Sequence, residues 1–226
     1  MTSKITISKD VFDFLSELRL NNNKEWFEAN KPTFKTHEKS VKGFFESVKE
    51  GLEHHDEIEK MKMFRIYRDV RFSKDKTPYK SHLAASFSRL GAHLRGGYYV
   101  HLSPGDSMIA TGFWAPNKED LMRIRKELEM DANEFRAVIG HKNLKNIWGD
   151  LEGEEVKTAP KGFDKTHPDI DLIKKKQFVF IRKFSDKEVL SDTFLDEVNT
   201  SFKVIRPYFD LMSDILTTNL NGESIL

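Results

Sequence analysis

Apolar residues recur at helical spacing near the N-terminus. Val11, Leu15 and Leu18 lie three or four residues apart, and this spacing predicts a first helix. A second apolar stripe of the same period runs on to about Glu53. Pro32 lies before this stripe, and proline is favoured in the first turn of a helix, so we expect the second helix to begin there.

The pattern changes to alternation in the middle of the chain. Four segments read as strands, namely residues 64–67, 82–88, 98–102 and 108–113. The last two are separated by the turn signal Ser103-Pro104-Gly105-Asp106. Strands that follow one another with short turns between them predict an antiparallel meander.

Helical spacing returns after this meander. We expect a helix from Asn117, a long polar surface excursion over residues 142–176, and a last strand at 178–184. A helical region follows to the C-terminal end, and Pro207 should kink or break it because proline lacks a backbone donor and clashes with the preceding turn. The predicted fold is α+β, with a central antiparallel sheet packed by N-terminal and C-terminal helices in a single domain over 1–226.

Composition narrows the function classes. The 226 residues include no Cys, which excludes disulfides, thiol catalysis and Cys-based metal centres. No apolar run reaches the roughly 18 residues of a membrane span, and the first residues lack the apolar core of a signal peptide. We therefore expect a cytoplasmic protein that does not bind membranes.

The formal net charge of +1 conceals a local asymmetry. Residues 60–95 hold ten basic side chains against two acidic ones, a local charge of +8, so the rest of the chain carries −7. A basic segment of this kind attracts anions. The alternative is that its cations are solvated at strand ends.

The segment RDVRFSKDKTPYK, residues 68–80, concentrates this charge. Its cationic and phenolic donors are Arg68, Arg71, Lys74, Lys76, Tyr79 and Lys80. Arginine and lysine match phosphate or carboxylate groups, whereas Asp69 and Asp75 are suited to orienting those cations, capping a turn or sharing a divalent metal with a bound phosphate. Pro78 restricts the backbone beside the donors.

Three segments together resemble a known family. They are FLSELRLNNNKEWFEANK at 14–31, RDVRFSKDKTPYK at 68–80 and GYYVHLSPGDSMIATGFWAP at 97–116. They are similar to a widespread, mainly bacterial family of conserved hypothetical proteins, a domain of unknown function. The matching positions are Asn22, Asn23, Trp26 and Phe27 in the first, Arg68, Asp69, Arg71, Phe72, Ser73, Asp75, Lys76, Pro78, Tyr79 and Lys80 in the second, and Gly97, Tyr98, Tyr99, Pro104 and Gly112 in the third. The resemblance implies no established activity.

Our hypothesis is that these polar residues bind a phosphorylated or otherwise anionic small molecule at one mouth of the sheet. The candidate ligand-binding residues are Asn22, Asn23, Trp26, Arg68, Asp69, Arg71, Lys76, Tyr79, Lys80, Tyr99 and His101. One alternative is structural, with the segment forming an internal ion-pair network. Another is single-stranded nucleic-acid binding through basic strands with interleaved aromatic residues, although the acidic remainder would repel a long polyanion.

The sequence does not identify an enzymatic reaction. His82 and His101 are candidate acid–base groups on the polar alternations of neighbouring strands, but no nucleophile or partner spacing singles them out. The adjacent pair His54 and His55 does not make a zinc site, because neighbouring residues point apart on a helix. The familiar protease, esterase, P-loop and Rossmann motifs are missing, and neither a cofactor nor a metal site is indicated.

Overall fold

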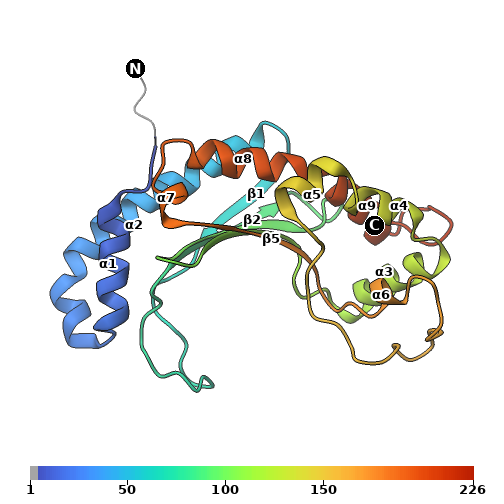
Figure 1. The fold of residues 1–226 in the computed structure, drawn as a ribbon, viewed down its shortest axis with the longest axis horizontal. Helices are drawn as coiled ribbons and strands as arrows, with labels where there is room; N and C mark the ends of the chain where they lie inside the picture. The colour runs from blue at the N-terminus through green and yellow to red at the C-terminus, as the bar shows by residue number, and fades with distance from the viewer. Residues whose placement is uncertain (1–4) are drawn as a thin grey trace. The chain divides into compact units, whose positions relative to one another are not determined.

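The structure is a computed structural model, and it describes residues 5–226 (Figure 1). Contacts divide the chain into two compact units. Unit 1 holds the described residues up to Phe87, Tyr99–Ile109 and Lys183–Thr200, and unit 2 holds Ser88–Tyr98, Ala110–Arg182 and Ser201–Leu226. Strands β2 to β5 each place residues in both units, so the single domain stays a prediction.

The five strands form one sheet in sequential order, which confirms the α+β class and the meander. Their bounds are β1 Ile58–Met63, β2 Leu83–Arg89, β3 Gly97–Leu102, β4 Ser107–Phe113 and β5 Phe178–Phe184. Side chains alternate between buried and less buried along β3 and β4, as expected for strands with one face packed on a core.

The first strand differs from the prediction. A strand at 64–67 is wrong, because β1 ends at Met63 and Tyr67 instead makes an isolated antiparallel bridge to Tyr79. The sequence of β1, IEKMKM, is half charged and lies at the edge of the sheet. Edge strands tolerate charge because one side of the backbone needs no partner, so the apolar pattern there was too weak to detect.

Helices of unit 1 include α1 (Lys9–Leu20), α2 (Lys24–Glu53) and α7 (Asp186–Val189). The first helix is as predicted, but a start of the second at Pro32 is wrong. The Asn23 side chain accepts a hydrogen bond from the Trp26 backbone N–H at 2.9 Å and caps α2, which begins at Lys24, about two turns before Pro32. Pro32 therefore lies inside the helix.

Unit 2 contains α3 (Lys118–Met130), α4 (Asn133–Ile139), α5 (Lys142–Trp148), α6 (Ile170–Ile173) and α9 (Arg206–Thr217). The prediction of a long polar surface excursion over 142–176 is wrong in part. Short helices interrupt it, and Leu144 and Trp148 are buried. Their apolar residues are too few to produce a helical stripe in the sequence.

The C-terminal helical region is broken as predicted. Helix α8 (Phe194–Val204) ends just before Pro207, which occupies the first turn of α9. Within residues 5–226 no helix combines the length and the apolar character that crossing a membrane requires.

Candidate functional site

The basic segment forms an arm of unit 1, drawn as the teal loop in Figure 1. We call residues 68–80 the basic arm. At its root the Arg68 N–H donates to the Pro78 carbonyl at 2.9 Å, and the Lys80 N–H donates to the Ile66 carbonyl at 2.7 Å. These two hydrogen bonds hold the two ends of the basic arm side by side.

The root is fastened to the turn between α1 and α2. The Asn22 side chain donates to the Tyr79 carbonyl at 2.9 Å and accepts from the Tyr79 backbone N–H at 3.1 Å. The Tyr79 ring is buried and stacks on Phe27 with centroids 4.0 Å apart. Both the nitrogen and the oxygen of the Asn22 side-chain amide are therefore bonded to the Tyr79 backbone, and these bonds position the basic arm.

Much of the charge of the arm is paired internally. Arg68 forms an ion pair with Asp75 and donates to the Thr77 hydroxyl at 2.6 Å. Hydrogen bonds from the backbone N–H of Thr77, and then from Arg68, lower the pKa of Asp75 to about 2. Asp75 is therefore a carboxylate at neutral pH, and it holds the Arg68 guanidinium in place.

The second arginine of the arm is paired as well. Arg71 donates to both oxygens of Asp69, at 2.9 and 2.6 Å, and this pairing lowers the pKa of the Asp69 carboxyl. Lys76 donates to the Val70 carbonyl at 2.9 Å. Because Arg71 and Lys76 point into the arm's own contacts, they do not line the concavity described next.

A concavity of about 580 Å³ lies at the root of the basic arm. We call it the arm concavity, and it is lined by Arg19, Asn22, Arg68, Asp69, Asp75, Thr77, Tyr79, Lys80, Ser81 and His82. Of the eleven predicted ligand-binding residues it gathers Asn22, Arg68, Asp69, Tyr79 and Lys80. Arg19 was missed because nothing in the chain links the end of α1 to a segment almost 50 residues away.

Two cations of the arm concavity lack a carboxylate partner. Arg19 donates to the Ser103 hydroxyl and the Pro104 carbonyl, both at 3.1 Å, and Lys80 donates to the Arg65 carbonyl at 2.9 Å. Within residues 5–226 neither forms an ion pair. Burial and then the neighbouring arginines lower the pKa of Lys80, as expected for a cation in a field of like charge.

His82 forms one wall of the arm concavity and lies against His101, with ring centroids 4.2 Å apart. Burial first, and then His101 and the nearby cations, lower the pKa of His82 to about 4. Burial also lowers the pKa of His101. The Tyr99 hydroxyl lies 3.1 Å from His101 Nδ1. Both imidazoles are therefore neutral at pH 7. His82 lines the arm concavity, whereas Tyr99 and His101 are not among its lining residues.

The remaining predicted residues have structural contacts. Asn23 caps α2, and the Trp26 ring packs on Phe14 with centroids 5.6 Å apart. Neither residue lines the arm concavity. Their place next to Asn22 in the sequence made them candidates, but the first turn of α2 directs them elsewhere.

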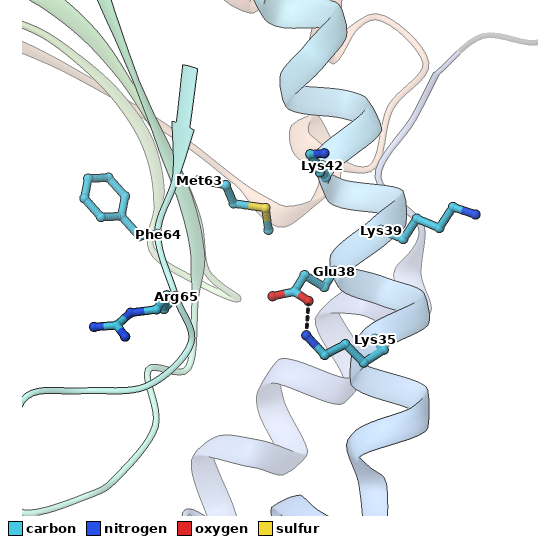
Figure 2. A pocket seen from close by; sticks show the side chains of 7 residues that line it. All are labelled: Lys35, Glu38, Lys39, Lys42, Met63, Phe64 and Arg65. Carbon is cyan, nitrogen blue, oxygen red and sulfur yellow. Dashed lines mark hydrogen bonds and ion pairs between the residues drawn. The ribbon is translucent and has the colours of Figure 1, made fainter. Parts of the chain in front are cut away.

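A second basic concavity, of about 400 Å³, lies between α2 and the end of β1. Figure 2 shows that Lys39 and Arg65 point to opposite sides of it, so their charges do not converge. Lys35 pairs with Glu38 at 2.6 Å. This concavity is therefore a poorer anion site than the arm concavity. The described part of the chain contains no group of three or more His, Asp or Glu side chains suited to a metal ion.

Comparison with known proteins identifies one family. The sequence model of a family described as conserved hypothetical protein (DUF2461) matches residues 10–211. No curated protein and no solved structure matches the chain.

Proposed function

We propose that this chain, which belongs to the DUF2461 family of conserved hypothetical proteins, binds a phosphorylated or otherwise anionic small molecule in the arm concavity. The observation that supports this most directly is the presence of Arg19 and Lys80 on one concave surface without a carboxylate partner in the described chain. A cation in that state gains more from a bound anion than one that is already paired.

Size and donor chemistry agree with this proposal. Small-molecule sites usually enclose roughly 300–1,000 Å³, and the arm concavity has about 580 Å³. Ser81 and neutral His82 add hydrogen-bonding groups beside the two cations. Arg68 is held by Asp75, so one of its nitrogens is fixed in direction before any ligand arrives.

Thermal stabilisation tests the proposal. The panel contains nucleotides, phosphosugars, inorganic phosphate and sulfate, each added to the wild-type chain. A ligand at 100 times its Kd stabilises the folded state by about 2.7 kcal/mol, which corresponds to roughly 5–10 °C for a chain of this size. If no member of the panel raises the melting temperature, the proposal fails.

A matched pair of variants locates the site. Lys80→Met removes the charge from the arm concavity but keeps most of the side-chain length. Lys74→Met makes the same change at an exposed position of the basic arm that does not line the concavity. We expect Lys80→Met to lose most of the ligand-induced shift and Lys74→Met to keep it. Equal shifts in the two variants would place the ligand elsewhere.

Single-stranded nucleic acid is a second candidate, favoured by one observation. Phe72 is 95% exposed on the basic arm, and the Arg71 guanidinium carbon lies 6.0 Å from its ring centroid. An exposed ring beside a cation offers a stacking surface for a base. Phe72→Ala would weaken binding of labelled single-stranded DNA or RNA, and that binding would also fall steeply between low and high salt.

The structural alternative makes a different prediction. If the ion pairs of the basic arm serve stability alone, Asp69→Asn lowers the melting temperature and no panel member changes it further. Because Asp69 and Arg71 are both exposed, we expect that variant to unfold at nearly the wild-type temperature.

A further inference from the structure

We infer that the ligand of the arm concavity carries a dianionic oxoanion group, as a phosphomonoester, inorganic phosphate and sulfate do, and that His82 takes up a proton when this group binds. The inference rests on the proposed function and adds the ligand's charge class and its coupled proton. It is carried by the charge balance of the concavity and by the position of His82 in its wall.

The charge balance favours two negative charges on the ligand. The carboxylates that line the concavity, Asp69 and Asp75, are each engaged by an arginine of the basic arm. Among the cations that line the concavity, Arg19 and Lys80 have no carboxylate partner within residues 5–226. Two such cations on one concave surface are matched by a dianion, whereas a monoanion would leave one of them uncompensated.

The groups around His82 explain why it is neutral in the free protein. His101 of β3 lies against its ring, Lys80 and Arg68 of the basic arm lie beside it, and Arg19 approaches from α1. Each of these neighbours is a cation or becomes one on protonation, and the ring is also largely removed from water. These effects hold the pKa of His82 near 4.

The contacts of His101 indicate that the proton is taken up by His82 and not by His101. The Tyr99 hydroxyl lies 3.1 Å from His101 Nδ1, so this ring nitrogen already has a hydrogen-bond partner within the protein. Asp106, the carboxylate whose charge favours protonation of His101, is itself in an ion pair with Lys183 at 3.3 Å. His101 does not line the concavity, and two rings 4.2 Å apart do not both ionise readily.

A bound dianion offsets the positive field at His82. The positive charges that oppose its protonation are then compensated, and a protonated imidazole adds a further charge-assisted hydrogen bond to the ligand. Binding and protonation are therefore linked, and affinity rises as the pH falls. With one proton taken up, the association constant increases by up to about tenfold for each pH unit of acidification.

Sulfate titrations of the intact chain between pH 5 and 8, followed by calorimetry at constant ionic strength, test the inference. Sulfate stays a dianion across this range, so any pH dependence belongs to the protein. We expect affinity to rise towards pH 5, and acetate, a monoanion, to bind at least about tenfold more weakly than sulfate. Inorganic phosphate and glycerol 3-phosphate separate the free ion from an ester. Both gain a proton of their own near pH 6–7, so their affinity passes through a maximum.

Variants identify the titrating group. His82→Gln keeps a polar side chain, and we expect it to bind sulfate with an affinity that no longer changes with pH. His93→Gln alters an exposed histidine outside unit 1 and serves as the control, with the wild-type pH dependence. In wild-type protein the NMR titration of the His82 ring gives an independent reading, since sulfate should raise the pKa of His82.

The outcomes separate the two proposals. Sulfate binding that is independent of pH, or a pH dependence that persists in His82→Gln, overturns the inference but not the proposed function. Equal affinity for acetate and sulfate overturns the dianion assignment. If neither sulfate nor any member of the phosphate panel binds at any pH, the proposed function fails, and the inference fails with it.

Discussion

Asn22 provides the sharpest test of how the candidate site is built. Its side-chain amide bridges the backbone N–H and carbonyl of Tyr79, at 3.1 and 2.9 Å, and so joins the turn after α1 to the root of the basic arm. The Tyr79 side chain is only 3% exposed, so water has poor access to this root. Replacing Asn22 by Ala removes both partners of the Tyr79 backbone at once.

The expected cost follows from these two hydrogen bonds. Each is worth about 1 kcal/mol net, and a buried backbone group left without a partner costs a similar amount or more. We therefore expect Asn22→Ala to lower the free energy of unfolding by about 2 kcal/mol. For a chain of this size that loss lowers the melting temperature by roughly 4–8 °C.

Urea denaturation and amide hydrogen exchange provide the measurements. Asn21→Ala is the matched control, because the Asn21 side chain is exposed and donates only to the Glu17 carbonyl of its own helix. We expect the control to lose less than about 0.5 kcal/mol. Exchange should accelerate at the root amides of Arg68 and Lys80 in Asn22→Ala alone. Equal losses in both variants, or unchanged exchange at those amides, would refute the positioning role of Asn22.

Three further predictions concern the fold and its pH dependence. Gly112→Ala should lower the free energy of unfolding by about 2–3 kcal/mol in urea titrations, because φ is +114° and a Cβ would lie 2.3 Å from the Phe178 carbonyl oxygen. The control is Gly43→Ala, in open space on α2, which should instead raise the free energy of unfolding by about 0.5–1 kcal/mol. A Gly112→Ala variant more stable than the wild type would contradict this reasoning. Ser185→Ala should lower the free energy of unfolding by about 1 kcal/mol in the same assay, since it removes the capping box of α7. An unchanged urea midpoint would show that this cap does not contribute to stability. Burial lowers the pKa of His82 from 6.5 to about 4, so between these values the unfolded chain binds a proton that the folded chain does not. The free energy of unfolding should therefore fall as the pH falls through that window, with a smaller slope in His82→Gln; equal slopes would show that His82 does not contribute.

Residues of the arm concavity that are neighbours in one segment could be grouped from the sequence, whereas those from other segments could not. The basic arm was recognisable because its donors are neighbours in the chain, and Arg68, Tyr79 and Lys80 do line one concavity. Arg19 could not be found in the same way, because its approach to the arm depends on how the turn after α1 docks on Tyr79. That docking is a long-range contact without a local signature.

The ion pairs within the basic arm could be predicted only in part from the sequence. The acidic residues were expected to orient neighbouring cations, and the short-range pair of Asp69 with Arg71 has that form. The partner of Arg68 is Asp75, seven residues away across the arm. Which cations remain available to a ligand depends on how the basic arm folds. A count of charges along the chain cannot show this, since it treats every cation alike.

The spacing of apolar and polar residues was enough to predict the meander and its α+β class. The missing backbone donor of Pro207 was enough to predict an interruption of the C-terminal helical region. Each of these features depends on residues that are close together in the chain. The start of α2 was missed because a single cap, Asn23, outweighed the preference of Pro32 for a first turn. The pairing of His82 with His101, and the loss of their charge at neutral pH, required the register of adjacent strands and the removal of water around them. Those are properties of packing between distant parts of the chain, which local sequence patterns do not encode.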